Sequence, residues 1–123
     1  MHDQVIARAE MLEIPDHAVI ATDAAGMVIY WDRGAQELYG WSAAEAIGRD
    51  ILDLTPTDMS RTQAIQIMRS LKQGATWRGK FGVRGKYGEL FIADVTDIPV
   101  HDSAGNLIGI IGRSRRDRRS KPR

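Results

Sequence analysis

The sequence predicts an α+β fold: a five-stranded antiparallel sheet, short helices, one long helix between the second and third strands, and an N-terminal flanking helix. Two observations lead to this prediction. Strand-forming segments occur twice before residue 32 and three times after residue 75, and short turns rich in Gly, Asp and Asn join them into hairpins. Elsewhere apolar residues recur at every third or fourth position, the spacing of amphipathic helices.

The N-terminal segment is expected to form a helix over residues 4–13, which ends before Pro15. Two strands follow over residues 18–22 and 27–31, and the sequence DAAG forms the turn between them. The apolar stripe of the helix consists of Val5, Ile6, Ala9 and Leu12.

Short helices are expected after the first hairpin. Asp32 is a typical N-cap for a helix over residues 34–39, Ser42 caps the next one, and residues 50–54 form another. The long helix is expected over residues 59–73 and ends at a glycine. Its apolar face consists of Ala64, Ile65, Met68 and Leu71.

The C-terminal part returns to strands, over residues 76–84, 90–100 and 107–115. The sequences GKYGE and HDSAGN form the turns between them. Three consecutive strands joined by hairpins complete an antiparallel sheet.

The composition is that of an ordinary globular domain. The 123 residues are 43% apolar and 27% charged, which predicts one hydrophobic core. The absence of cysteine excludes disulfides, thiolate metal sites and cysteine nucleophiles. No apolar run approaches the ~18 residues of a membrane span, and the first ten residues are too polar for a signal peptide. We therefore expect a cytoplasmic domain without membrane insertion.

The charges are distributed unevenly along the chain. Residues 113–123 contain seven basic residues and one acidic residue, so the remaining residues carry ten basic and fifteen acidic side chains. Such a tail can contact nucleic acid or an anionic membrane, or it is a solvated terminus or linker. No recognition helix accompanies it, so no specific nucleic-acid binding is expected.

Several short motifs carry a family resemblance. They include Asp23 before the first turn, the pair Gly40-Trp41, and the E-x-x-G-R element at residues 45–49. With this order of elements, residues 13–116 resemble the PAS domain family. Asp32 stands where the family usually has asparagine, and the basic residues 115–118 replace the usual closing D-[IV]-T. The resemblance implies a flanking helix over residues 1–13, a PAS domain over residues 14–116 and a basic tail over residues 117–123.

The resemblance also assigns the faces of the sheet. In the last two strands, the set expected to face the helices and any ligand cavity consists of Phe91, Ala93, Val95, Asp97, Ile108, Ile110, Gly112 and Ser114. The outer set is apolar too and consists of Met27, Ile29, Trp31, Ile92, Ile98, Leu107 and Ile111. Because such a face cannot remain wet, we expect the N-terminal helix to cover it and to contribute to a homodimer interface. The candidates for this interface are Val5, Ile6, Ala9, Leu12, Ile29, Trp31 and Ile111.

A cavity with apolar walls and a few polar groups is expected between the sheet and the helices. The candidates for its lining are Thr22, Val28, Tyr30, Ile65, Met68, Trp77, Phe81, Val95, Asp97, Ile110 and Ser114. Asp97 is unusual, because a carboxylate at an inward position must be paired, protonated or solvated. It either binds a donor on a ligand, or reaches water or a basic residue such as Arg84 or Lys86.

No cofactor is expected other than an unknown small molecule. Haem-binding PAS domains similar to this chain use a histidine on the long helix, and residues 59–73 contain none. Light-sensing flavin chemistry requires a cysteine. A redox flavin remains an alternative, because Trp77-Arg78-Gly79 is similar to a Trp-x-Gly sequence of some flavin-binding members.

The resemblance implies a sensory and dimerisation module of a bacterial-type signalling protein, such as a two-component system, coupled to an effector domain or a partner protein. The alternative is a ligand-free domain that only assembles. The chain lacks G-x-S-x-G, Walker and H-E-x-x-H motifs, and Asp94 and Asp97 lie on opposite strand faces. No catalytic residue and no metal site are therefore expected.

Overall fold

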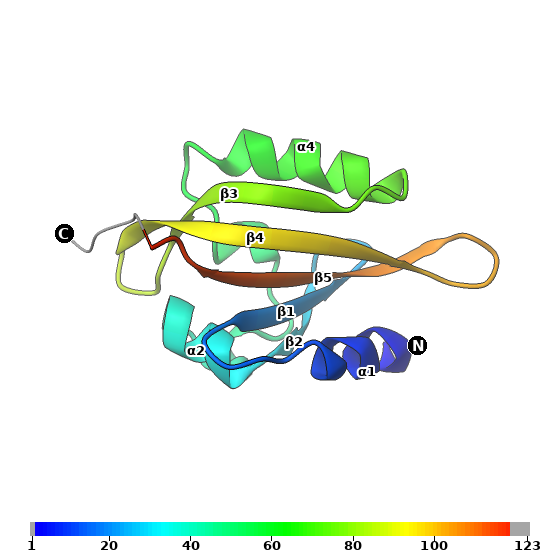
Figure 1. Ribbon diagram of the computed structural model, residues 1–123, viewed down its shortest axis with the longest axis horizontal. Coiled ribbons are helices and arrows are strands. Elements are labelled where there is room, and N and C mark those ends of the chain that lie inside the picture. Colours follow the sequence, from blue (N-terminus) through cyan, green and yellow to red (C-terminus); the bar gives the residue numbers. More distant parts are fainter. Residues whose placement is uncertain (1, 119–123) are drawn as a thin grey trace.

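Five antiparallel strands form one sheet in the order β2-β1-β5-β4-β3 in the computed structural model, which describes residues 2–118 (Figure 1). The predicted α+β fold is confirmed. The elements are α1 (Asp3–Met11), β1 (Ala18–Asp23), β2 (Val28–Trp31), α2 (Arg33–Tyr39), α3 (Ala43–Ala46), η1 (Ile51–Asp53), α4 (Arg61–Lys72), β3 (Trp77–Arg84), β4 (Leu90–His101) and β5 (Leu107–Arg116). No helix within residues 2–118 is long and apolar enough to cross a membrane.

Caps fix the helices that connect β2 to α4. The Asp32 carboxylate accepts hydrogen bonds from the backbone N–H of Ala35 (2.8 Å) and of Val19 (2.9 Å), so it caps α2 and also ties the helix to β1. The Ser42 side chain caps α3 in a capping box with Glu45, as predicted. These caps place α2 and α3 directly after the first hairpin.

The long helix begins at Arg61 rather than at residue 59. The preceding turn is closed by Ser60, whose hydroxyl contacts the Thr57 backbone N–H (2.9 Å) and the Gly82 carbonyl oxygen (2.7 Å). The turn therefore fixes the start of α4 against β3.

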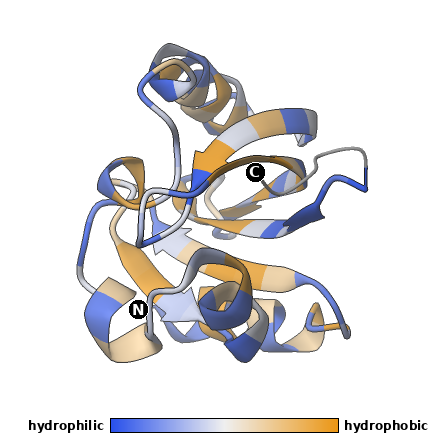
Figure 2. Cartoon of the chain, turned by 90° about the vertical axis from the view of Figure 1, so that its left-hand side faces the viewer, coloured by the Kyte–Doolittle hydropathy of each residue, from blue (hydrophilic) through white to orange (hydrophobic). Residues whose placement is uncertain are grey.

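Two hydrophobic cores lie on the two faces of the sheet. In the side view of Figure 2, helices lie above and below strands that carry many hydrophobic residues. The inner face packs against α2, α3, η1 and α4 and forms the larger core. The outer core lies beneath α1 and consists of Val5, Ala9, Val19, Ala21, Val100 and Ile111. The predicted packing of the N-terminal helix on the outer face is thus present within one chain.

Gly109 allows α1 to approach the sheet closely. A Cβ atom at this position would lie 2.7 Å from a Cγ atom of Val5, which is closer than real Cβ contacts. The helix packs mainly on β1, β2 and β5. The outer side chains of β3, and those of β4 up to Thr96, lie outside this contact, whereas Val100 of β4 is buried beneath the helix.

A bulge in the first hairpin reverses the expected faces of two aromatic residues. The register passes from Ala21 opposite Tyr30 to Thr22 opposite Val28, so Ile29 is the extra residue. Trp31 then faces the inner core, where its Nε1 donates to the Trp41 carbonyl oxygen (2.7 Å).

The faces of Trp31 and Tyr30 were therefore predicted wrongly. Tyr30 packs in the outer core, where burial and the neighbouring Glu13 raise the pKa of its hydroxyl group.

A second irregularity affects the β4–β5 hairpin. Val100 pairs with Gly109 but His101 pairs with Leu107, so Ile108 is the unpaired residue. Ile108 packs against the outer core and Leu107 against the inner one, the reverse of the prediction. The strict alternation assumed for the strand fails at this bulge because one extra residue changes the phase.

The beginning of the predicted tail is part of the fold. Asp117 is buried, its backbone N–H donates to the Ile92 carbonyl oxygen (2.9 Å), and its carboxylate lies 3.2 Å from Lys80 Nζ. The remainder of the predicted basic tail, residues 119–123, lies outside the described residues.

Candidate functional site

A cavity of about 110 Å³ lies between the inner face of the sheet and the segment that runs from η1 to α4. Its apolar wall consists of Ile20, Ile51, Leu52, Pro56, Ala64, Ile67, Met68, Leu71, Phe81, Val83, Val95 and Ile110, with Gly112 in the floor. Its polar groups belong to Thr22, Tyr39, Thr55, Asp97 and Ser114. This combination of apolar walls and a few polar groups is typical of small-molecule sites.

Most of the residues predicted for a cavity lie around it. These are Thr22, Met68, Phe81, Val95, Asp97, Ile110 and Ser114. They come from four strands and from α4, so the fold brings distant segments together as expected. That these residues bind a ligand remains a prediction.

Four predicted lining residues lie elsewhere. Val28 is fully buried in the inner core, and Tyr30 lies on the outer face. Ile65 is 47% exposed, because α4 buries the stripe that contains Ile67 instead.

The Trp77 side chain does not line the cavity either. Its indole lies over Gly79, where a Cβ atom would approach the ring to 3.0 Å, and its edge packs against Phe81 with ring centroids 6.3 Å apart. The absence of a side chain at Gly79 thus provides the space that the indole occupies.

Asp97 lies on β4 between Trp77 of β3 and Gly112 of β5. Its carboxylate occupies the space that a side chain at residue 112 would take, since a Cβ there would lie 2.8 Å from Oδ1. Burial raises the pKa of this carboxyl group to about 7. Near neutral pH the group therefore exists in both protonation states.

The basic residues considered as partners of Asp97 have other partners. Arg84 donates to the backbone oxygen of Asp53 (3.0 Å), and Lys86 Nζ lies 2.6 Å from the Glu45 carboxylate. Within residues 2–118, the Asp97 carboxyl group has no hydrogen bond or ion pair with another side chain. Of the alternatives left open for Asp97, pairing with Arg84 or Lys86 is therefore wrong.

Three further hydroxyl groups, those of Tyr39, Ser114 and Thr22, belong to residues that line the cavity. The Tyr39 hydroxyl and the Ser114 hydroxyl form a buried hydrogen bond of 2.9 Å, and burial raises the pKa of Tyr39 to about 12. The Thr22 hydroxyl is buried and has no hydrogen-bond partner within residues 2–118. Burying an unpaired hydroxyl costs about 1–3 kcal/mol.

Sequence reasoning missed Tyr39 and Ile67 as cavity residues. The only signal for Tyr39 was its position as the last residue of α2 before the left-handed Gly40. The signal for Ile67 was its spacing of three from Ala64 and four from Leu71, which places it on the buried stripe.

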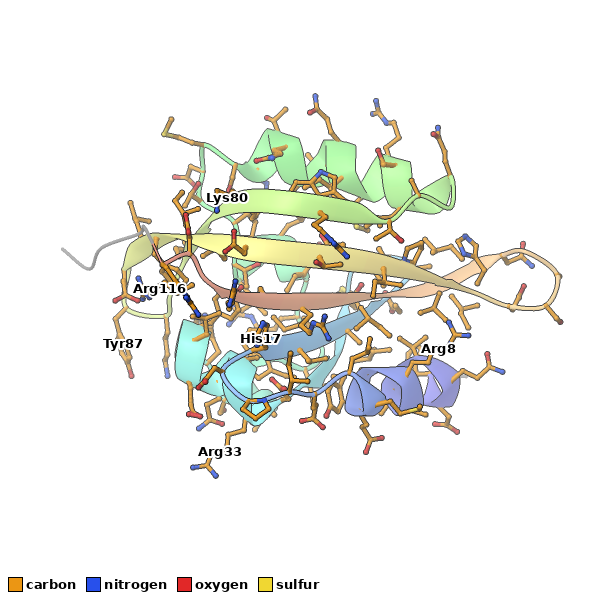
Figure 3. The ribbon with its side chains drawn as sticks, in the orientation of Figure 1. Arg8, His17, Arg33, Lys80, Tyr87 and Arg116 are labelled. Atoms are coloured by element: carbon orange, nitrogen blue, oxygen red, sulfur yellow. The ribbon has the colours of Figure 1, made fainter. Side chains whose placement is uncertain are left out.

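The outer face of the sheet carries a second group of charged residues. An open hollow there is lined by His17, Arg78, Lys80, Asp94, Thr96, Arg113 and Arg115, among others. Lys80 stands on β3 (Figure 3) and lies 2.7 Å from the Asp94 carboxylate. The surface is thus predominantly basic, and α1 does not cover it.

Most of the residues predicted for a dimer interface pack against other residues of the same chain. Val5, Ala9 and Ile111 are buried beneath the helix, and Ile29 packs beside them. Val5, Ala9 and Ile111 are therefore inaccessible to a partner while α1 stays on its own sheet, whereas Ile29 is half-buried. Ile6 and Leu12 are partly exposed.

The comparisons with known proteins identify the family of this fold. A family model described as the PAS fold matches residues 8–116, so the chain belongs to the PAS family. A PAS domain is generally a sensory or interaction module rather than a catalytic one.

Solved structures agree with this assignment. The PAS domain of a protein from Colwellia psychrerythraea superposes with a TM-score of 0.80 and 22% identity, over 94% of this chain and 98% of that chain. The PAS-B domain of Drosophila melanogaster Cycle gives a TM-score of 0.73 in a variant with bound glycerol, at 13% identity, and in the wild type with bound ethylene glycol, at 11% identity. Both comparisons cover 81% of this chain and 99% of those chains.

A probable serine/threonine-protein kinase of Dictyostelium discoideum is 26% identical over 87 residues. The match covers 67% of this chain and 6% of the kinase. The chain therefore spans only a small part of that relative.

Proposed function

We propose that this chain is the sensory module of a signalling protein and that it binds a small molecule in the cavity beneath α4. One observation carries the proposal: an apolar cavity contains a carboxyl group and a hydroxyl group that no side chain of residues 2–118 satisfies. Buried polar groups are normally hydrogen-bonded, and those left open in a cavity indicate what a ligand would supply.

The size of the cavity limits the ligand. An apolar cavity of about 150 Å³ is known to hold benzene, and drug-sized ligands occupy at least about 300 Å³. A cavity of about 110 Å³ therefore suits a molecule of a few non-hydrogen atoms. Glycerol and ethylene glycol, which the Cycle domains hold, belong to this size class. This size favours an unknown small molecule over haem or flavin.

The test is native mass spectrometry of the freshly purified protein, followed by NMR titration with compounds of up to about six non-hydrogen atoms. Ala64→Leu, which fills the cavity from α4, is expected to abolish the shifts of cavity amides. Ala44→Leu on the exposed side of α3 is the matched control and is expected to leave them unchanged. If no compound moves the cavity amides, or if Ala64→Leu leaves the shifts intact, the proposal is wrong.

The signal is proposed to pass to an effector outside this chain. The Dictyostelium kinase supports a place in signalling, because a segment similar to this chain occurs within it. A cytoplasmic protein of a two-component system is the setting we propose.

Homodimerisation is a second candidate function, and it is favoured by complementary charges on the outer face. The part of the outer face that α1 leaves uncovered presents Arg78 of β3 and Arg113 of β5, for which residues 2–118 provide no ion pair within 4 Å. The exposed side of α1 and the residues that follow it present acidic side chains, among them Glu10 on the helix and Glu13 just beyond its end. In a two-fold dimer, α1 of one copy would lie against the basic strands of the other, and each contact would occur twice.

Charge exchange tests the dimer. Arg113→Glu and Glu10→Arg are each expected to lower the dimer fraction measured by analytical ultracentrifugation, and the double variant is expected to restore it. Arg33→Glu is the control, because Arg33 extends from α2 into solvent (Figure 3). A wild type that stays monomeric up to millimolar concentration contradicts the proposal.

A further inference from the structure

We infer that the ligand of the cavity is a small organic cation, an amidinium or a protonated amine, whose N–H groups donate hydrogen bonds to the Asp97 carboxylate. This inference rests on the proposed function, because it requires that the cavity binds a small molecule at all. It adds the chemical class of that molecule.

The charges around Asp97 lead to this class. The lining side chains from η1 and α4 are Ile51, Leu52, Ala64, Ile67, Met68 and Leu71, all of them uncharged. Asp97 and Tyr39 are the titratable residues in the lining, and β3 and β5 place Trp77 and Gly112 beside the carboxylate. No Lys, Arg or His lines the described cavity, so a positive charge that balances the ionised Asp97 carboxylate there has to come from a ligand.

The geometry leaves the carboxylate free to accept two hydrogen bonds. Because Gly112 has no side chain, the Asp97 carboxylate can lie over β5 within the cavity. The nearby Tyr39 hydroxyl is hydrogen-bonded to Ser114 rather than to Asp97. An amidinium presents two parallel N–H donors, which match the two oxygens of a carboxylate. The rings of Tyr39 and Phe81 also line the cavity, and aromatic rings are favourable surroundings for a cation.

The protonation state of Asp97 predicts how the ligand affinity changes with pH. A cation binds the ionised form of Asp97, whereas a neutral ligand that accepts a hydrogen bond binds the protonated form. With a carboxyl pKa of about 7, the ionised fraction rises about tenfold between pH 6 and pH 8. The affinity for a cation is therefore expected to rise about tenfold over this range.

The experiment compares acetamidinium with acetamide, which has nearly the same shape but no charge. Each is titrated to 20 mM into the full chain at pH 6, 7 and 8, and the amide shifts of Gly112 and Ser114 are followed by NMR. We expect acetamidinium to bind at least about tenfold more tightly than acetamide at pH 8, and its affinity to fall toward pH 6.

Two variants on β4 provide the test and its matched control. Asp97→Asn removes the charge and is expected to reduce acetamidinium binding at least about tenfold, to the level of acetamide. Asp94→Asn changes a carboxylate on the opposite face of β4, beside Lys80, and is expected to leave binding unchanged. The amide spectrum of each variant shows whether it is folded.

The outcomes separate the two proposals. Equal binding of acetamide and acetamidinium, or an affinity for acetamidinium that does not change with pH, overturns the cationic class while small-molecule binding stands. If neither compound shifts the cavity amides, and the broader titration with small compounds also fails, both proposals are wrong.

Discussion

Replacing Asp97 by asparagine is expected to stabilise the protein at neutral and alkaline pH. The carboxyl pKa rises from an ordinary 3.8 to about 7 because folding buries the group without a partner charge. One pKa unit corresponds to about 1.4 kcal/mol, so ionisation costs the folded state at most about 4 kcal/mol. The buried amide of asparagine also has a desolvation cost, which reduces the expected gain to about 2 kcal/mol.

The sign of the pH dependence follows from the two states. Below pH 3.8 the carboxyl group is protonated in both states, so only the cost of burying the asparagine amide remains and the variant is expected to be less stable by about 2 kcal/mol. Between pH 3.8 and pH 7 the unfolded chain ionises while the folded one remains protonated, and the wild type loses stability relative to the variant. Above pH 7 the carboxyl group is ionised in both states, so the difference in stability between the variant and the wild type no longer changes with pH.

Urea unfolding at pH 4.5, 6, 7 and 8 measures this difference, provided that both proteins have the same dependence of free energy on urea. Asp94→Asn is the matched control, because Asp94 lies on the other face of β4 in an exposed ion pair with Lys80. Its effect is expected to stay below about 1 kcal/mol. A variant at Asp97 that is less stable than the wild type at pH 8, or whose difference does not change with pH, refutes the reasoning.

Substitutions at three further positions test the packing and the hydrogen bonds around the sheet. Gly109→Ala places a methyl group against Val5, so we expect a loss of about 1–3 kcal/mol and faster hydrogen exchange in α1; unchanged exchange contradicts the close approach. Tyr39→Phe leaves the buried Ser114 hydroxyl unpaired and is expected to cost about 1–2 kcal/mol in urea unfolding, whereas a neutral effect would show that this bond is unimportant. Asp32→Ala removes a cap and a link to β1 and is expected to cost about 2–3 kcal/mol by thermal unfolding, while Asp32→Asn keeps an acceptor and is expected to cost less than about 1 kcal/mol; equal losses would contradict the capping role.

The order of elements was predictable because each has a local signal. The caps at Asp32 and Ser42 mark helix starts by residue type, and the turn sequences mark the hairpins. The position of α1 on the outer face followed from the apolar stripe and from the need to cover an apolar sheet. These inferences depend only on the residue types within a few positions along the sequence, or on the general cost of exposing apolar surface.

The faces near the bulges were not predictable in the same way. The extra residues Ile29 and Ile108 change the phase of β2 and β5, and a bulge depends on the register of the partner strand rather than on alternation. The position of Asp97 against Gly112 likewise depends on which residues of β4 and β5 are paired. Sequence alone identified Asp97 as unusual but not the glycine that provides its space.

Stability and ligand binding together distinguish a structural role of Asp97 from a functional one. A carboxylate with a structural role holds hydrogen-bond donors in place, so its removal is expected to destabilise the protein, as we predict for Asp32→Ala, which removes the acceptor of two backbone N–H groups. Asp97 has no such donors among the described residues and lies in a cavity beneath α4, so its ionisation weakens the fold. A residue that binds a ligand but lowers the stability of the ligand-free protein behaves in this way. An Asp97→Asn variant that is both more stable and unable to bind acetamidinium would therefore assign the residue to recognition, and a variant that is less stable with unchanged binding would assign it to the fold.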